Sequence, residues 1–232
     1  MKKGKIVISK NGPYLVSGGL PLAKDIVKIG KDGEPEKWAK GRRYPAKENY
    51  ALCRCGQSRN MPFCDGTHAE AGFDGNETAS RLSFAEQAKT IAGPGIDLRD
   101  AEPLCAEGHF CKPMGGTWNL TLESADPEKR KAAIRQACNC PAGRLVALDK
   151  ETGKAIEPER APAIGLIEDP QSCVSGPIWV KGGVEIESQG GQGYEVRNRV
   201  TLCRCGQSEN KPFCNGNHIR ARFNDGDASL KK

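Results

Sequence analysis

The sequence has no long apolar run, and no stretch approaches the roughly 20 apolar residues of a membrane-spanning helix. Residues 1–8 are basic, with an apolar stretch too short for a secretory signal. We therefore expect an intracellular, cytoplasmic protein with no membrane partner. A strong excess of charge is also missing, because the net charge is +6 and the basic tracts are short. Nucleic-acid binding usually needs a denser basic patch, so we expect no nucleic-acid partner.

Large hydrophobic residues are scarce: Leu, Ile, Val and Phe number 42 among 232 residues, and aromatic residues make up 6%. Small domains with such thin cores usually need metals or disulfides. Gly and Pro, at 28 and 15 residues, predict many turns, and the 11 Cys are the main anomaly. Because an unexported chain meets a reducing environment, clustered Cys favour metal or redox chemistry over disulfides.

The chain contains an internal repeat. Residues 52–68 read LCRCGQSRNMPFCDGTH and residues 202–218 read LCRCGQSENKPFCNGNH, so 13 of 17 aligned positions are identical. Upstream, residues 11–19 match residues 175–183, which leaves 14 extra residues before the Cys motif of the first copy. In each copy a Gly-Pro turn, an apolar run, a Gly-Gly turn and a second alternating run predict a β-hairpin. Residues 195–202 predict a further strand that runs into the second Cys motif.

The segment between the copies has a different composition. Asp126 followed by Pro127 predicts the start of a helix that continues to about Cys138. Residues 115–122 before it and residues 144–148 after it predict strands. The segment is therefore expected to be a small β-α-β insert.

These patterns predict an α+β, β-rich fold. Each repeated unit is too small to bury much surface alone, so we expect the two units to pack as an internal pseudo-dimer that shares one β-layer. The expected domains are a first unit at 1–80, the insert at 81–173 and a second unit at 174–232. Because the pair forms within one chain, it favours a monomer.

Each repeat carries the pattern Cys-x-Cys, eight residues, Cys, three residues, His. The two sets are Cys53, Cys55, Cys64 and His68, and Cys203, Cys205, Cys214 and His218. In an extended segment, residues i and i+2 point to the same side, so the first two Cys can bind one metal ion. The third Cys and the His, at i and i+4, can share one helical face. Because thiolate and imidazole suit both zinc and iron–sulfur clusters, spacing alone leaves the metal open.

The first motif, from Cys53 to His68, resembles the CDGSH iron–sulfur family, whose pattern is C-x-C-x2-[ST]-x3-P-x-C-D-G-[SAT]-H. The second motif has Asn215 and Asn217 where the family has Asp and a small residue. The resemblance implies two redox-active [2Fe–2S] clusters, each held by three Cys and one His in a β-rich paired fold. It also implies electron transfer, cluster transfer or redox sensing, with redox or cluster-acceptor proteins as partners.

Five Cys and one His lie outside the repeats, namely Cys105, Cys111, Cys138, Cys140, Cys173 and His109. Cys105, Cys111 and Cys140, the last followed by Pro, resemble a divergent ferredoxin-like segment. That resemblance would imply a third cluster in the insert, with Cys138 or His109 as the fourth ligand. The alternative is a structural insert whose Cys are free thiols or a disulfide. Cys173 aligns with no predicted ligand, and we treat it as incidental.

Three functions compete at this point. The first is an iron–sulfur protein for electron or cluster transfer, and the second is a zinc-stapled structural or interaction module without a redox role. The third is an enzyme subunit that holds a substrate on the basic surface and the insert. The sequence shows no nucleophile–base pair, phosphate-binding loop or carboxylate pair, so we expect no enzyme.

Overall fold

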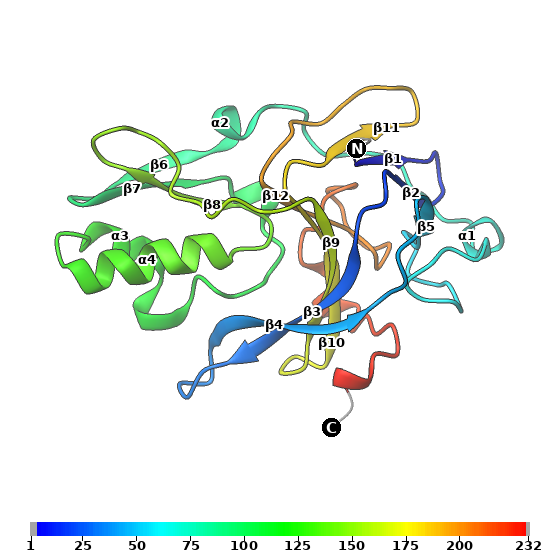
Figure 1. The fold of residues 1–232 in the computed structure, drawn as a ribbon, viewed down its shortest axis with the longest axis horizontal. Helices are drawn as coiled ribbons and strands as arrows, with labels where there is room; N and C mark the ends of the chain where they lie inside the picture. Colours follow the sequence, from blue (N-terminus) through cyan, green and yellow to red (C-terminus); the bar gives the residue numbers. More distant parts are fainter. Residues whose placement is uncertain (1–3, 231–232) are drawn as a thin grey trace.

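The structure, a computed structural model, describes residues 4–230. Its described part is β-rich α+β, with three sheets and few helices (Figure 1). In Figure 1 the insert, drawn mainly in green, lies to the left of the two larger sheets. None of the helices within residues 4–230 has the length and apolar character needed to cross a membrane.

The two larger sheets are each built from both copies of the repeat. The first sheet has the strand order β11-β1-β2-β5, with β11 Glu185–Ser188, β1 Lys5–Ile8, β2 Tyr14–Ser17 and β5 Tyr50–Leu52. The second sheet has the order β12-β10-β9-β3-β4, with β12 Arg199–Leu202, β10 Val174–Lys181, β9 Ala163–Asp169, β3 Leu22–Ile29 and β4 Pro35–Arg43.

The predicted hairpins are wrong, because the two strands of each one lie in different sheets. β2 belongs to the first sheet and β3 to the second, while β10 belongs to the second and β11 to the first. β3 runs parallel to β9, with Leu22 opposite Ile164, and β11 runs parallel to β1, with Ile186 opposite Ile6. The alternation of apolar and polar residues along a strand determines which of its side chains are buried, but not which other strand pairs with it. The first copy therefore gives β3 and β4 to the second sheet, and the second copy gives β11 to the first sheet.

One apolar core lies between these sheets. It takes side chains from both copies, among them Ile6, Tyr14, Leu52, Ile164, Ile178 and Leu202, each 1% exposed or less. The third strand of the second unit is confirmed in part: residues 195–202 were predicted, and β12 covers the last four of them. The shared core means that neither copy buries its strands alone.

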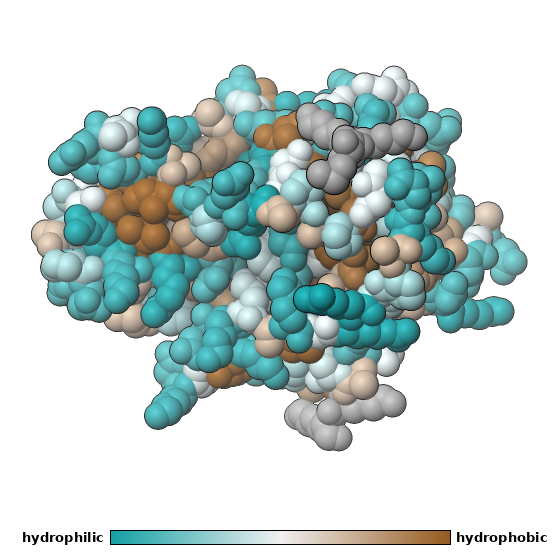
Figure 2. Space-filling view, in the orientation of Figure 1, coloured by the Kyte–Doolittle hydropathy of each residue, from teal (hydrophilic) through white to brown (hydrophobic). Residues whose placement is uncertain are grey.

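The insert has its own antiparallel sheet and two helices on it. The sheet has the order β6-β7-β8, with β6 Lys89–Ala92, β7 Ile96–Asp100 and β8 Leu145–Asp149. The helices are α3 Thr117–Leu122 and α4 Pro127–Asn139, preceded by α2 Phe84–Gln87. Figure 2 shows hydrophilic side chains over most of the visible face, with a hydrophobic patch on the insert.

Part of the prediction for the insert is confirmed. α4 starts after Asp126, whose carboxylate accepts hydrogen bonds from the N–H groups of Glu128 and Lys129, and β8 covers most of the predicted second strand. The strand predicted at 115–122 is wrong, because this segment forms α3. There the Thr121 hydroxyl donates to the carbonyl of Thr117, one helical turn earlier, at 2.8 Å. The sheet also contains β6 and β7, so the insert is not a simple β-α-β unit.

The remaining helices are single turns. They are α1 Thr67–Glu70, α5 Asn217–Arg220 and the 3-10 turns η1 Glu102–Leu104, η2 Pro113–Gly115 and η3 Ala228–Leu230. The three domain boundaries stay predictions. Within the range predicted for the insert, β9 pairs with β10 of the second unit.

Candidate metal centre

Both Cys-x-Cys segments directly follow a strand. β5 ends before Cys53 and β12 ends before Cys203. A tight loop then returns to the same point, because Cys53 N–H donates to the Pro62 carbonyl and Cys203 N–H to the Pro212 carbonyl, each at 2.8 Å. The Sγ atoms of the two Cys in each motif are 3.7 Å apart in both copies. The loops therefore present two sulfurs side by side, as the i, i+2 spacing predicts.

The third Cys and the His of each motif also lie together. The Cys64 Sγ is 3.4 Å from His68 Nδ1, and the Cys214 Sγ is 3.4 Å from His218 Nδ1. The prediction that one helical face presents both is wrong, since α1 begins three residues after Cys64. Gly66 instead adopts a left-handed conformation with φ 93°, which turns the chain so that the ring meets the sulfur.

The predicted ligands thus form two donor pairs in each copy. Within residues 4–230, only one group of three or more His, Cys, Asp and Glu residues has donor atoms that all lie within 4.8 Å of one another. This group is Glu168, Asp225 and Asp227. No three of the four predicted ligands in either copy come that close together. Each copy therefore holds its donors as separated pairs.

The turn before each short helix differs in charge between the copies. The Asp65 carboxylate accepts hydrogen bonds from the N–H groups of Thr67 at 3.1 Å and Arg59 at 2.8 Å. Hydrogen bonding from the Thr67 side chain, followed by the N–H groups of Thr67 and Arg59, lowers the pKa of Asp65 to about 2. In the second copy the Asn215 side chain accepts from Asn217 N–H at 3.2 Å. The second turn keeps its geometry and lacks the negative charge.

The two Cys loops touch each other across the pseudo-repeat. A Cβ added at Gly56 would lie 2.6 Å from the carbonyl oxygen of Cys205, and one added at Gly206 would lie 2.4 Å from that of Cys55. In addition, the buried Tyr14 hydroxyl donates to the carbonyl of Cys203 at 2.8 Å. A residue of the first copy therefore helps to fix the Cys loop of the second.

An arginine stands between the first two Cys of each motif and is fully buried in both copies. Arg54 donates to the carbonyl oxygens of Gly75 at 2.6 Å and Ser9 at 3.3 Å. Arg204 instead pairs with Glu168 at 2.8 Å and with Asp225. The charge of Arg204 is thus offset by carboxylates, whereas Arg54 meets carbonyl groups. These arginines were not predicted from the sequence, although their place between two predicted ligands in both copies was a signal.

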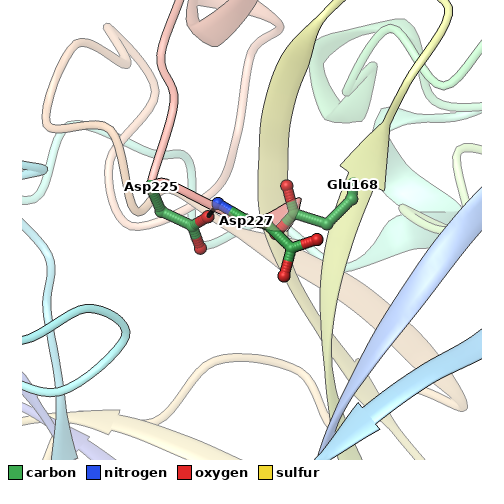
Figure 3. Close-up of side chains that lie close together, drawn as sticks. All are labelled: Glu168, Asp225 and Asp227. Atoms are coloured by element: carbon green, nitrogen blue, oxygen red, sulfur yellow. Dashed lines mark hydrogen bonds between the residues drawn. The ribbon is translucent and has the colours of Figure 1, made fainter. Parts of the chain in front are cut away.

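Figure 3 shows the acidic cluster of Glu168, Asp225 and Asp227, which the sequence analysis also missed. The Lys24 ammonium contacts all three carboxylates, at 2.6 Å from Asp225 and 3.4 Å from Asp227. Arg204 contacts two of them from the other side. Two cations of the chain itself, Lys24 and Arg204, already pair with these carboxylates, so we do not interpret the cluster as a metal site. No sequence pattern links Glu168 in β9 with Asp225 and Asp227 in the segment after α5.

Burial is the main cause of the pKa shifts of Cys214 and His218 in the second site. Burial and the positive charge of Arg204 lower the pKa of His218 to about 4, which keeps its imidazole neutral and able to bind a metal. Burial raises the pKa of the Cys214 thiol, so that a cation is needed to stabilise its thiolate.

All cysteines outside the two motifs are free thiols. Cys105, Cys111 and Cys140 line one cavity of about 210 Å³ in the insert, together with His109. Cys138 is not among the lining residues of this cavity, and its Sγ donates to the carbonyl of Ile156 at 3.2 Å. The cavity adjoins the second site, since Cys140 packs against the buried cluster of Ala106, Ala142 and Cys214.

Cys173, which we treated as incidental, lies between β9 and β10 with its Sγ 3.6 Å from the carbonyl of Pro170. It is not part of either donor set.

Two stretches, residues 11–69 and 175–219, match the family model for the iron-binding zinc finger of CDGSH type. They contain both donor sets, so the class that the fold and the sites define is an iron-binding domain of this type. The chain contains two CDGSH-type domains in tandem. Searches of curated proteins and of solved structures each gave no match.

Proposed function

We propose that this chain binds two redox-active [2Fe–2S] clusters, one at each Cys3His set, and serves in electron transfer, cluster transfer or redox sensing. The observation that carries the proposal is the grouping of the four donors in each copy into two separated pairs. When bound, such a cluster takes up or gives up one electron at a time.

The donor grouping favours a two-iron cluster over the zinc alternative. A single tetrahedral zinc with Zn–S bonds of about 2.3 Å would bring all four donors to about 3.8 Å from one another. The donor pairs are 3.7 Å and 3.4 Å wide, yet no three of the four predicted ligands in a copy lie within 4.8 Å of one another. A two-iron cluster takes its ligands as one pair on each iron, which suits Cys53 with Cys55 and Cys64 with His68.

The residues of the chain set the charge of each site. Three thiolates and a neutral imidazole give one negative charge fewer than four thiolates. A less negative site accepts an electron more readily, so its potential lies above that of an all-Cys site. The neutral state of His218, enforced by burial, fits this charge count.

We further propose that the two units form an internal pseudo-dimer within a monomer. The exchanged strands β3 and β11 support it, because each unit completes the sheet of the other. The approach of Gly56 to Cys205, mirrored by Gly206 and Cys55, also supports it. Redox proteins or cluster acceptors remain the proposed partners.

The test is an anaerobic purification with a visible spectrum and with iron, sulfide and zinc analysis of the same sample. Four irons and four sulfides per chain with a visible charge-transfer band are expected. Two zincs in a colourless protein that cannot be reconstituted with iron and sulfide would contradict the proposal. The variant Cys53→Ser should remove about half of the visible absorbance, since one of two Cys3His sites loses a thiolate.

A second candidate is a third cluster in the insert, favoured by the shared cavity of Cys105, Cys111 and Cys140. Burial, together with the nearby thiols of Cys140 and Cys105, raises the pKa of Cys111 to about 11. Such crowding of thiols without a disulfide is suited to a metal that stabilises thiolates. His109 lines the same cavity and is the better placed fourth ligand than Cys138. Iron in excess of four per chain that disappears in Cys111→Ser would support this site.

A further inference from the structure

We propose that the two sites divide their tasks: the first is the exchange site that faces a thiol-bearing acceptor protein, and the insert caps the second so that it retains its cluster. This inference rests on the proposed function. It concerns which of two sites an acceptor can reach, and it is carried by differences between residues that are equivalent in the repeat.

The first difference is the burial of equivalent ligands. Cys214 and His218 are 2% and 5% exposed. Their counterparts Cys64 and His68 are only half-buried. The Cys-x-Cys pairs are buried in both copies. Access therefore differs on one side of the site only, the side of the third Cys and the His.

The second difference lies at the glycine of the turn, which has nearly the same backbone conformation in both copies. Gly66 has φ 93° and Gly216 has φ 86°. A Cβ added at Gly66 would meet no atom within 4 Å, whereas one added at Gly216 would lie 2.3 Å from Cγ of Glu107. The same turn is thus open in the first copy and covered by the insert in the second.

The cover over the second site is held in place by its own contacts. The Glu107 carboxylate is 2.8 Å from Nε2 of His109 and 3.6 Å from the Cys105 Sγ. Beneath it, Cys214 packs against Ala106 and Ala142 of the insert, which belong to one buried cluster. The loop that contains Glu107 therefore forms a cap over the His side of the second site.

Beside the imidazole of the first site lies Gly12, whose counterpart in the repeat, Gly176, is also a glycine, so the two sites differ in the cap and not at this position. A Cβ added at Gly12 would lie 3.6 Å from Nε2 of His68, so the residue facing the imidazole has no side chain. Asp65 and Gly66 beside it are exposed. An acceptor could reach this edge without moving any element of the fold.

Exchange at the open site is a substitution of ligands. Each bond from a protein donor to iron breaks as an acceptor thiolate forms its replacement, and the electron count of the cluster does not change. The protons of the acceptor thiols pass to the released thiolates and imidazole. Such a substitution needs the incoming sulfur to approach the iron, which the cap over the second site prevents.

The experiment uses the full-length loaded protein and an iron chelator, with loss of visible absorbance followed in time. We expect two phases of equal amplitude whose rates differ at least about tenfold, because thiolate chemistry follows exposure. Cys53→Ser should remove the fast phase. Glu107→Ala should accelerate the slow phase alone, and the matched control Glu102→Ala, an exposed residue of the same insert, should change neither.

A second measurement needs no cluster. In the apo protein, brief alkylation followed by peptide mass spectrometry should label Cys64 at least about tenfold faster than Cys214. Glu107→Ala should speed the labelling of Cys214 and so bring its rate closer to that of Cys64. Equal labelling, a single chelation phase, or loss of the slow phase in Cys53→Ser would overturn the inference. A protein that takes up no iron and sulfide would instead overturn the proposed function, while the labelling still tests access.

Discussion

Gly56 of the first Cys loop packs directly against the carbonyl group of Cys205 in the second, so closely that an added Cβ would lie 2.6 Å from the oxygen. The contact is reciprocal, because Gly206 approaches Cys55 in the same way. Neither loop can shift toward the other, and a distortion of one site reaches the other through the backbone alone.

Gly56→Ala should therefore damage both sites together. The left-handed conformation, φ 77°, costs about 1–2 kcal/mol for any L side chain. The clash with Cys205 should bring the total loss in unfolding free energy to at least about 3 kcal/mol. Urea unfolding of the apo protein measures this loss. The matched control is Gly33→Ala, with φ 79° and open space around it, which should show the conformational cost alone. Equal losses in both variants would contradict the role of the contact.

Tyr14→Phe should weaken the second site although Tyr14 belongs to the first copy. Its hydroxyl donates to the carbonyls of Cys203 and Pro212, at 2.8 Å and 3.1 Å, and both would lose a buried partner. We expect a loss of about 1–3 kcal/mol in unfolding free energy. The chelation rate of the second site should rise as well. Tyr50→Phe removes a single hydroxyl bond within the first copy and should leave that rate unchanged.

The stability of the apo protein should fall in acid through Asp225. Burial opposes its ionisation, but the charges of Arg204 and Lys24 outweigh burial and hold the pKa of Asp225 well below its usual range. A depressed folded-state pKa gives stability that is present above about pH 4 and lost as the pH falls further.

Urea unfolding at pH 7 and pH 3 measures this effect. Asp225→Asn should cost about 3–5 kcal/mol at pH 7, because Arg204 and Lys24 lose a buried partner, and the variant should depend less on pH. Asp97→Asn, which breaks a more exposed pair with Lys150, should cost less than about 1 kcal/mol. An Asp225→Asn variant with an undiminished pH dependence would refute this assignment.

His68→Cys should lower the reduction potential of the first cluster and slow its loss in acid. The change replaces a neutral ligand by a thiolate and removes an imidazole that protonation can release. Voltammetry of the loaded protein measures the potential. The matched variant His218→Cys should shift the second cluster in the same direction. A potential that stays in place or rises would count against the charge argument.

The closeness of the donors within each pair could be predicted from the sequence, because it depends on local spacing. Strand ends place the paired Cys side by side, and the pairing of Cys64 with His68 needs only one turn of chain. The start of α4 was predictable for the same reason, since Asp126 and Pro127 act on the residues that follow them.

Strand pairing and contacts between segments far apart in the sequence could not be predicted in this way. The alternation in β3 and β11 identifies buried faces, but pairing with β9 and β1 depends on where the other copy lies. Residues 117–122 alternate apolar and polar like a strand, yet they form a helix that packs against α4. The contact of Glu107 in the insert with Gly216 likewise joins residues far apart in the sequence, so no local pattern predicts it.

The exchange of β3 and β11 makes each copy dependent on the other. A chain cut down to either copy would leave β1 or β9 with an unpaired, aggregation-prone edge, because each takes its parallel neighbour from the other copy. Either copy alone would need a second molecule to restore the missing strand. The two sites therefore belong to one folding unit, although equivalent residues around them differ.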